Sequence, residues 1–387
     1  MHLLMLSAYR SVYPFEESQL DHQVMGALAQ HFDSVHMVVR SRDRTRRSWS
    51  GVRVGVTYLP LASPPVSTLL FLMSCFLLSV SLIRRNKVDV VSGSDLAGSL
   101  VGVALKLLFR KPLVVQLQNE FFDPHVSMGS GLKRAFLRWL AGRVCRRADA
   151  IRCVSRSLMD NARAHGVPAE KLFTIGTRAD TKMFDPSRFS SQRQELRKEI
   201  AVDDRKVLVF TGSLARRKGV DVLLAALSQV VSTLPDAYLL IAGEGPERPR
   251  LTALCDQFGL TENVRFLGHT DYTKIPALLA TADIYVFPSF SEGMPRAVLE
   301  AMAMELPVVS SKVDGIGEVI ENDNTGLLVQ PGDETELAQA LLRVLGDSDF
   351  GRDLGVRARA FVLENYEFEA QIVKLADIHL NTVNHRN

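Results

Sequence analysis

Cysteine is scarce in this sequence of 387 residues, and the four cysteines show no regular spacing. Because no Cys-x-x-Cys pair occurs, neither a zinc site nor a disulfide framework is predicted, and a reducing compartment fits best. Short repeats and low-complexity tracts are also lacking. With 47% hydrophobic and 23% charged residues, the chain falls outside the disordered, collagen-like and coiled-coil classes. Its length favours two globular domains.

Neither a signal peptide nor a clear membrane-spanning segment is expected from the sequence. The apolar residues at the N-terminus are too few for a signal peptide and follow no Lys or Arg. Residues 67–83 are uncharged but number only 17, which is at the lower limit for a spanning helix, and they include five Ser or Thr. We therefore expect a helix that is buried in the core or dips into a surface, in a cytoplasmic protein.

Charge is distributed unevenly along the chain. Residues 1–185 carry 25 Lys or Arg and 14 Asp or Glu, a net charge of +11, whereas residues 186–387 carry 21 and 29, a net charge of −8. Basic side chains cluster in residues 40–47 and 131–152. A nucleic acid, a phospholipid surface and a polyphosphate substrate are the candidate partners. Nucleic acid is disfavoured because no recognised binding module occurs. We expect the basic half to dock on an anionic membrane surface, peripheral at its inner face.

Short apolar runs alternate with amphipathic segments of helix length throughout the chain. This pattern is typical of parallel sheets covered by helices, and the predicted fold class is α/β with one Rossmann-like sheet in each half. The predicted strands are residues 3–7, 35–39, 54–59, 88–93, 112–118, 150–155 and 172–176 in the first half, and 206–212, 237–243, 263–268, 284–289, 307–311 and 326–330 in the second.

Glycine turns follow two of the strands in the second half. Gly212 ends the first of them and is followed by Arg216, Arg217 and Lys218, and Gly243 ends the next, just before Glu244. A glycine turn with free N–H groups and cations at the carboxyl end of a strand can hold a phosphate.

The most informative segment is PSFSEGMPRAVLEAMAMELPVVSS, residues 288–311. Glu292 follows a strand, and Gly293, Met294 and Pro295 come just before a helix whose N-terminal N–H groups could hold a diphosphate. Glu300 lies eight residues after Glu292, and its carboxylate could accept hydrogen bonds from the vicinal hydroxyls of a ribose. The alternative is that Glu300 is only a residue of the helix surface, although the alanines around it indicate close packing.

Several motifs together carry a family resemblance. GSLARRKG, GEGP, VRFLGH, PSFSEGMPRAVLEAMA, LPVVSS and GEVIENDNTGLLV, in this order and spacing, resemble the C-terminal domain of retaining GT-B glycosyltransferases of family 4, the group 1 type. VDVVSGSDLAG, PLVVQLQNEF and ADAIRCVSRSLMDNARAHGVPAEKL resemble the N-domain of that family more loosely. The resemblance implies two Rossmann-like domains facing across a cleft, with a C-terminal helix that returns to the N-domain. The expected division is an acceptor-binding domain at 1–185, a linker at 186–204, a donor-binding domain at 205–365 and the returning helix at 366–387.

The resemblance implies transfer of a sugar from a UDP- or GDP-sugar to a saccharide acceptor, with retention of configuration. No cofactor and no obligatory metal are expected, and no Asp-x-Asp pair stands near a strand end in the second half. A lipid-linked acceptor in polysaccharide, lipopolysaccharide or glycolipid synthesis would suit the basic, membrane-facing half. In the family, the residue at Glu292 lies by the donor sugar, that at Glu300 binds the ribose, and that at Lys218 neutralises the diphosphate. The other donor-binding residues implied are Gly212, Ser213, Arg217, Glu244, Gly268, His269, Gly293, Met294 and Pro295, although His269 could also be a simple loop histidine.

The chain departs from the family pattern at several positions. Ser213 stands where the family often has Arg, and Glu305 stands where it usually has Gly. Asn119 and Glu120 lie in the loop where the family's N-domain often has a histidine near the reacting sugar. Either of them could position the acceptor hydroxyl as a catalytic residue, or both could belong to an ordinary polar loop.

Two other functions stay open at this point. The first is a nucleotide-sugar epimerase of the GT-B fold, which the pair of Glu292 and Glu300 disfavours. The second is a catalytically silent nucleotide-sugar-binding partner in a membrane assembly, which the altered N-domain loops suggest.

Overall fold

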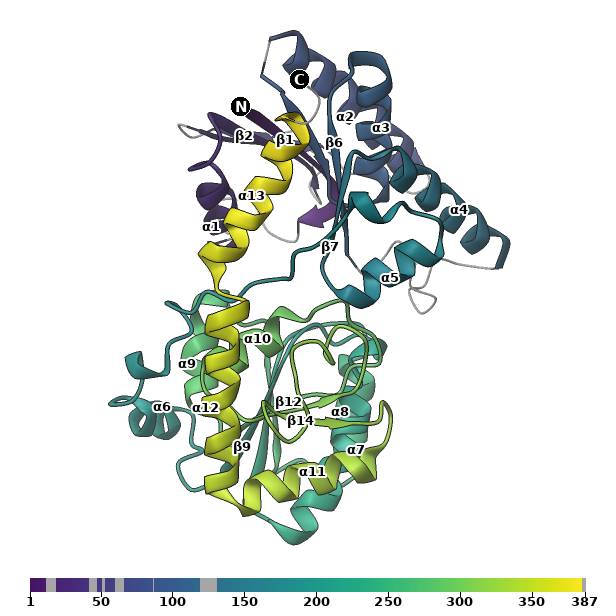
Figure 1. The fold of residues 1–387 in the computed structure, drawn as a ribbon. Coiled ribbons are helices and arrows are strands. Elements are labelled where there is room, and N and C mark those ends of the chain that lie inside the picture. Colours follow the sequence, from purple (N-terminus) through teal and green to yellow (C-terminus); the bar gives the residue numbers. More distant parts are fainter. Residues whose placement is uncertain are drawn as a thin grey trace. The chain divides into compact units, whose positions relative to one another are not determined.

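The protein is described by a computed structural model that covers residues 1–11, 19–41, 47–50, 53–59, 66–85, 87–118 and 131–384. The chain forms two compact units (Figure 1). Met1–Gly176 and Glu369–Asn387 make up the first unit, and Thr177–Phe368 make up the second.

The first unit is built on an eight-stranded sheet with the order β3-β4-β2-β1-β5-β6-β7-β8. All neighbours are parallel except β3 and β4, which pair antiparallel at one edge. The strands are β1 (His2–Ser11), β2 (Ser34–Ser41), β3 (Arg47–Ser50), β4 (Val54–Leu59), β5 (Val90–Gly93), β6 (Leu113–Leu117), β7 (Ala150–Cys153) and β8 (Leu172–Thr174). The sequence prediction found all of these except β3, whose polar residues lack the apolar run of a central parallel strand.

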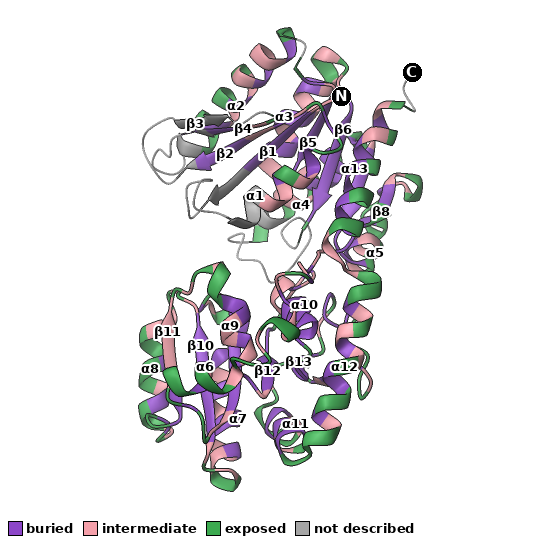
Figure 2. Ribbon diagram, turned by 90° about the vertical axis from the view of Figure 1, so that its left-hand side faces the viewer, coloured by how far each residue is buried: buried purple, intermediate pink, exposed green. Residues whose placement is uncertain are grey.

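Helices cover the first sheet: α1 (Gln19–Leu28), α2 (Val66–Arg84), α3 (Leu96–Phe109), α4 (Gly131–Arg147), α5 (Arg156–Ala164) and the closing helix α13 (Phe368–Asn384). Because helices lie on both faces, β5, β6 and β7 are buried along their whole length, which explains why most of their residues are apolar (Figure 2). From Glu369 onward the C-terminal helix belongs to the first unit, so the predicted return of the chain to the N-domain is confirmed.

The helix α2 combines a buried and an exposed face. Phe71, Cys75 and Ser79 are buried, whereas Met73 and Leu77 on the opposite face are more than half exposed. The segment is therefore neither wholly in the core nor wholly at the surface. No helix within the described ranges is both long enough and apolar enough to cross a membrane.

A row of buried polar side chains crosses the first sheet. The Arg152 guanidinium donates to Gln116 Oε1 at 3.0 Å and to the carbonyls of Ile175 at 2.9 Å and Gly176 at 2.8 Å. Gln116 in turn donates to Ser92 Oγ at 2.9 Å. Burial lowers the pKa of Arg152 to about 10, which still leaves it charged at neutral pH. Arg152 thus fixes the last residues before the chain enters the second unit.

His379 of α13 is fully buried in the first unit. Its Nδ1 donates to Leu375 O at 2.6 Å, and its Nε2 has no hydrogen-bond partner among the described residues. The centroids of its ring and of the Phe32 ring are 6.4 Å apart, and the two rings pack edge to face. Burial lowers the pKa of His379 from 6.5 to about 4, and the positive charge of Arg152 adds to this effect.

We expect His379 to make the protein sensitive to acid. Its pKa is depressed in the folded state, so the unfolded chain binds the extra proton between pH 6.5 and about 4, and stability should fall as the pH drops through this window. At 1.36 kcal/mol per pKa unit, the loss is about 3 kcal/mol. His379→Leu should flatten this part of the stability profile, measured as urea midpoints against pH, while the exposed His31→Gln should leave it unchanged. An unaltered slope in His379→Leu would contradict this origin of the acid sensitivity.

The second unit contains a six-stranded, all-parallel sheet with the order β11-β10-β9-β12-β13-β14. Its strands are β9 (Lys206–Thr211), β10 (Ala237–Ala242), β11 (Val264–Gly268), β12 (Ile284–Phe287), β13 (Val308–Ser311) and β14 (Leu327–Val329), all of which were predicted. Numbered from the start of this unit the order is 3-2-1-4-5-6, which is the doubly wound Rossmann arrangement. The helices are α6 (Arg193–Glu199), α7 (Val220–Thr233), α8 (Arg248–Gln257), α9 (Ile275–Ala280), α10 (Arg296–Ala303), α11 (Glu334–Gly346) and α12 (Ser348–Asn365).

The boundary between the units falls at residues 176 and 177, earlier than the sequence suggested. Residues 186–204, expected as a linker, belong to the second unit, because hydrogen bonds and ion pairs bind α6 to it. Arg197 of α6 is buried and donates to the carbonyls of Thr281 and Val202, and it shares the carboxylate of Asp283 with Arg193.

Candidate functional site

The carboxyl ends of β9 and β12 form the centre of the candidate site. These adjacent parallel strands are the point where the strand order of the second sheet reverses, and ligands of doubly wound sheets bind at such a point. The loops that follow them lie side by side: Phe290 N donates to Arg217 O at 2.8 Å, and Ser289 Oγ lies 3.0 Å from the same oxygen. Gly219 permits this approach: a Cβ there would lie 2.0 Å from Pro288 O, and its φ of +65° favours glycine.

The Glu292 carboxylate meets three donors at this point. Its Oε1 accepts from Lys218 Nζ at 2.5 Å, Ser289 Oγ at 2.7 Å and Arg217 at 3.0 Å. The side chains of Glu292 and Lys218 are 7% and 10% exposed, whereas Arg217 is more open at 46%. Burial lowers the pKa of Lys218, and the charge of Glu292 opposes that shift. The structure therefore brings together three residues that the sequence placed in one site, and it adds Ser289.

The loop that leads into α10 is positioned by contacts with Gly315 and Thr177. A Cβ at Gly315 would lie 1.6 Å from Gly293 O, and Gly315 N donates to Glu292 O at 3.3 Å. Met294 Sδ accepts a hydrogen bond from Thr177 N at 3.2 Å, and Pro295 stands directly before the helix. Gly315 was not among the predicted site residues. A glycine next to Asp is common in loops, and the sequence does not show that the backbone of Gly293 packs against Gly315.

Glu300 is enclosed inside the second unit. It is 4% exposed, and its Oε1 accepts from Tyr272 Oη at 2.8 Å and lies 3.3 Å from Arg296 Nε. Burial raises the pKa of Glu300, whereas Arg296 and the Tyr272 hydroxyl oppose that rise. The alternative of a solvated helix surface residue is therefore wrong. Tyr272 and Arg296 were missed, because nothing local in the sequence connects the loop after β11 with α10.

The glycine turns after β9, β10 and β11 fasten these strand ends to one another. Gly243 has a φ of +154°, its N–H donates to Gly268 O at 2.8 Å, and a Cβ there would lie 1.8 Å from Gly212 O. Glu244 Oε1 accepts from His269 N at 3.3 Å. Four of the predicted donor-binding residues thus lie together at the carboxyl ends of these strands: Gly212, Glu244, Gly268 and His269. Ser213 is an exposed neighbour of Gly212 in the same turn.

Other predictions fall elsewhere. Asn119 and Glu120 lie outside the described residues. Glu305, at the position where the family usually has glycine, has a φ of +58° at the end of α10, which is the backbone conformation that glycine adopts without strain. No group of three or more His, Cys, Asp or Glu side chains that could hold a metal ion occurs in the described part of the chain.

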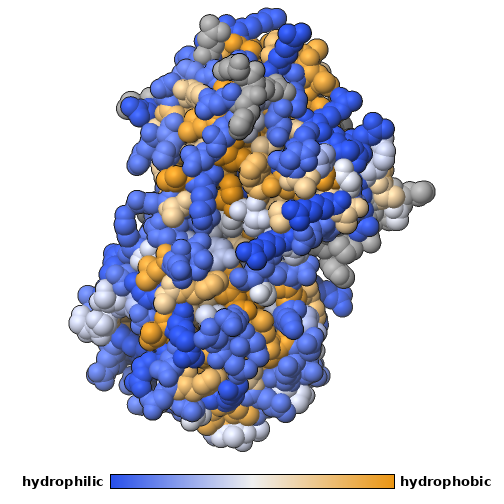
Figure 3. All heavy atoms as spheres, in the orientation of Figure 1, coloured by the Kyte–Doolittle hydropathy of each residue, from blue (hydrophilic) through white to orange (hydrophobic). Residues whose placement is uncertain are grey.

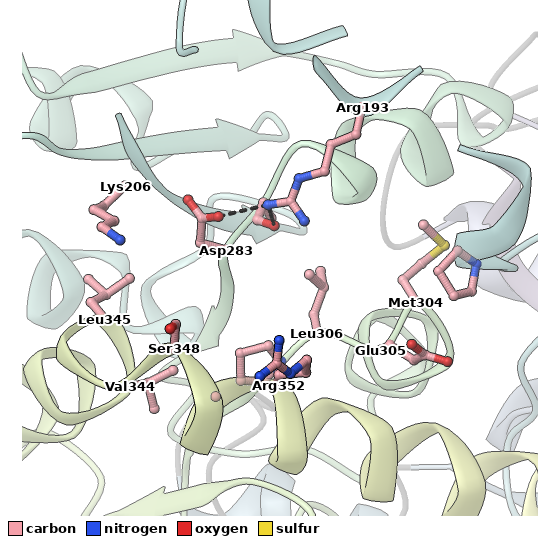
Figure 4. Close-up of a pocket in the computed structure, with 14 residues that line it drawn as sticks. Arg193, Lys206, Asp283, Met304, Glu305, Leu306, Val344, Leu345, Ser348 and Arg352 are labelled. Carbon is pink, nitrogen blue, oxygen red and sulfur yellow. Dashed lines mark hydrogen bonds and ion pairs between the residues drawn. The ribbon is translucent and has the colours of Figure 1, made fainter. Parts of the chain in front are cut away.

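A pocket of about 370 Å³ opens at the opposite end of the strands of the same sheet, where their amino ends lie (Figure 4). It is lined by residues that precede β9, β12 and β13 or begin them, including Lys206, Asp283 and Pro307, and by the turn between α11 and α12. Because it adjoins the amino ends of these strands, it is distinct from the site of Glu292 and Glu300.

Fold and site together define a glycosyltransferase of the GT-B type, and comparisons with known proteins agree. The family described as glycosyl transferases group 1 matches residues 192–361, and the glycosyl transferase 4-like domain matches residues 22–177. An uncharacterized glycosyltransferase of Methanocaldococcus jannaschii is 30% identical over 288 residues, 73% of each chain. The alpha-D-kanosaminyltransferase of Streptomyces kanamyceticus is 28% identical over 271 residues, 69% of this chain and 70% of the relative.

Solved structures show the same fold. Sucrose-phosphate synthase from Thermosynechococcus elongatus matches with a TM-score of 0.85 at 20% identity over the whole of both chains. WaaG, a glycosyltransferase involved in lipopolysaccharide biosynthesis, matches with a TM-score of 0.75 at 18% identity over 97% of this chain and 99% of WaaG. The chain therefore belongs to the group 1 glycosyltransferases, which confirms the predicted family and fold. It is a glycosyltransferase that uses a nucleotide sugar, and neither an epimerase nor a silent binding partner is favoured.

Proposed function

We propose that this protein transfers a hexose, with retention of configuration and without a metal ion, from a UDP- or GDP-sugar to a lipid-linked saccharide. The acceptor would belong to polysaccharide, lipopolysaccharide or glycolipid synthesis. The observation that supports this most strongly is the convergence of Lys218, Arg217 and Glu292 at the switch point of the donor-type sheet.

Each part of the site has a role in this proposal. Lys218 and Arg217 neutralise the donor diphosphate, so that the charge developing on the leaving phosphate is stabilised by fixed cations in place of a metal. The N–H groups of Gly293 and Met294, next to the start of α10, hold phosphate or sugar oxygens. Glu292 accepts hydrogen bonds from the donor sugar, and Glu300 accepts them from the ribose hydroxyls.

The names of similar proteins support the choice of donor and acceptor. Anabaena HepE, 20% identical with a TM-score of 0.77, has been solved with UDP-glucose. A mannosyltransferase of Mycolicibacterium smegmatis, 29% identical over 238 residues, is GDP-mannose-dependent and named for phosphatidylinositol monomannoside. A nucleotide sugar and a lipid-linked acceptor are therefore the substrate classes that we assign to this chain.

Transfer can be tested with purified protein, membrane lipid extract and labelled UDP- or GDP-sugars. Labelled lipid that forms only with protein and one donor would support the proposal. Conversion of the donor to an isomer without acceptor would replace it with an epimerase. Nucleotide binding with neither product would identify a silent binding partner.

The surface of the first unit supports attachment to a membrane. Large apolar side chains are exposed along three successive helices: Leu69, Leu70, Met73 and Leu77 on α2, Leu107 and Leu108 on α3, and Phe136 and Trp139 on α4. Figure 3 shows apolar atoms gathered in the region of α2 and α3. A groove of about 560 Å³ lined by Phe76, Leu77 and Phe109 has Arg84 and Arg85 beside it. We propose that this face binds the anionic inner leaflet, with apolar residues in the headgroup region and arginines on lipid phosphates.

Replacing Met73 and Leu77 together by serine should weaken vesicle binding. Both side chains are more than half exposed, so the change removes membrane-inserting area without opening the core. We expect at least roughly tenfold weaker partition onto phosphatidylcholine vesicles that contain phosphatidylglycerol, measured by co-sedimentation. The matched control replaces Val356 and Leu363, exposed apolar residues of α12 in the second unit, by serine. Equal vesicle binding by the two variants would refute this docking face. Failure of the wild-type protein to bind such vesicles at any salt concentration would also refute it.

A further inference from the structure

The candidate donor site contains an anion of its own. A single oxygen of this carboxylate, Glu292 Oε1, accepts hydrogen bonds from Lys218, Ser289 and Arg217 at distances between 2.5 and 3.0 Å. A carboxylate oxygen has two lone pairs, so three donors on one oxygen exceed what it can accept at full strength. The two cations gathered here outnumber the single charge of Glu292.

The side chains of Lys218 and Glu292 are only 10% and 7% exposed, so their pairing has a large effect on both charges. Lys218 Nζ also lies 4.7 Å from the centroid of the Phe287 ring, so one side of the ammonium faces an aromatic surface instead of water. A buried ammonium that loses its counter-ion without gaining another is strongly disfavoured. Glu292 can therefore leave Lys218 only when another anion arrives.

We propose that Glu292 occupies the diphosphate position of the donor site, and that the incoming diphosphate displaces it from Lys218 and Arg217. This inference rests on the proposed function. The exchange suits the charges, because a diphosphate in a nucleotide sugar carries two negative charges for two cations. The released carboxylate has only acceptor sites and turns to the hydroxyls of the donor sugar, which arrive with the diphosphate.

The exchange also lowers the preference of the site for a nucleoside diphosphate over a nucleoside. A nucleoside has no phosphate with which to replace Glu292, so it leaves the pair closed. A nucleoside diphosphate can replace the carboxylate, but only in competition with it. Wild-type affinity for the diphosphate is therefore lower than the cations alone would provide.

Glu292→Gln tests the exchange, because the amide keeps the size of the side chain and an acceptor oxygen but has no charge. The ligands are UDP, GDP and ADP, each with its parent nucleoside, and dissociation constants are measured by calorimetry. We expect Glu292→Gln to bind the preferred diphosphate about tenfold more tightly, which corresponds to about 1.4 kcal/mol, and to bind the nucleoside as the wild type does. Its sugar transfer should nevertheless fall, since the carboxylate is no longer available to the donor sugar.

The matched control is Asp349→Asn, which removes one charge from an exposed pair with Arg352 in α12 and should leave all affinities unchanged. Equal or weaker diphosphate binding by Glu292→Gln, with nucleoside binding intact, would overturn the exchange and leave the proposed function standing. Wild-type protein that binds none of the diphosphates would overturn the proposed function itself. Unchanged nucleoside binding shows that the variant is folded, so each result can be interpreted.

Discussion

Replacing Lys218 by glutamine should lower the rate of sugar transfer by about 10²–10³-fold, the typical cost of removing one preorganised charge-stabilising donor from an active site. Lys218 is a buried cation in the loop that follows β9, and under the proposed function its Nζ binds the donor diphosphate at the switch point of the sheet. The effect should appear in kcat more than in KM, because the charge on the leaving phosphate grows as the glycosidic bond breaks. Steady-state kinetics with the identified donor would measure it.

Loss of stability must be separated from loss of chemistry in this variant. Breaking a buried ion pair typically costs about 3–5 kcal/mol, and here Arg217 still faces Glu292 at 3.0 Å, so we expect a smaller cost. The double variant Lys218→Gln with Glu292→Gln removes both charges and should recover stability but not activity. If Lys218→Gln transfers sugar at the wild-type rate, the cation that serves the leaving phosphate lies elsewhere.

The sequence was sufficient to predict the sheets because their strands are buried on both faces. Runs such as residues 206–212 and 237–243 are predominantly apolar, end in glycine and alternate with helices, so the order of elements nearly determines a doubly wound sheet. β3 could not be found in this way, since an antiparallel edge strand needs no apolar run.

The candidate site was predictable only where the chemistry lies in one motif or follows a strand. Lys218 and Glu292 are 74 residues apart, yet each follows a strand end, and parallel strands bring such ends together. Tyr272 and Gly315 lie in loops with no distinctive local pattern, and their roles depend on contacts with Glu300 and Gly293. Such contacts between loops are a property of the folded chain, and periodicity contains no information about them.

Glu300→Gln should abolish the distinction between a ribose and a deoxyribose. In the wild type, Tyr272 and Arg296 hold one oxygen of Glu300 and fix the carboxylate inside the unit. Under the proposed function, this carboxylate accepts hydrogen bonds from the ribose hydroxyls. Hydrogen bonds to a charged group contribute about 1.5–3 kcal/mol, so the 2′-deoxy form of the preferred nucleoside diphosphate should bind the wild type at least roughly tenfold more weakly. In Glu300→Gln, the ribose form should lose affinity and the deoxy form should lose little.

Thermal stability gives a second measurement of the same contact. A ligand at about 100 times its dissociation constant adds roughly 2.7 kcal/mol of stability, and at the same ligand concentration a tenfold loss of affinity in Glu300→Gln should reduce this gain to about half. Tyr272→Phe keeps the ring and removes the hydroxyl that orients Glu300, so it should show an intermediate loss. Burial raises the pKa of Glu300, and because the ionised form is the acceptor, nucleotide binding should weaken as the pH falls toward that pKa. A deoxy penalty that persists undiminished in Glu300→Gln would place ribose recognition on another residue, and the raised pKa of Glu300 would then reflect its burial alone.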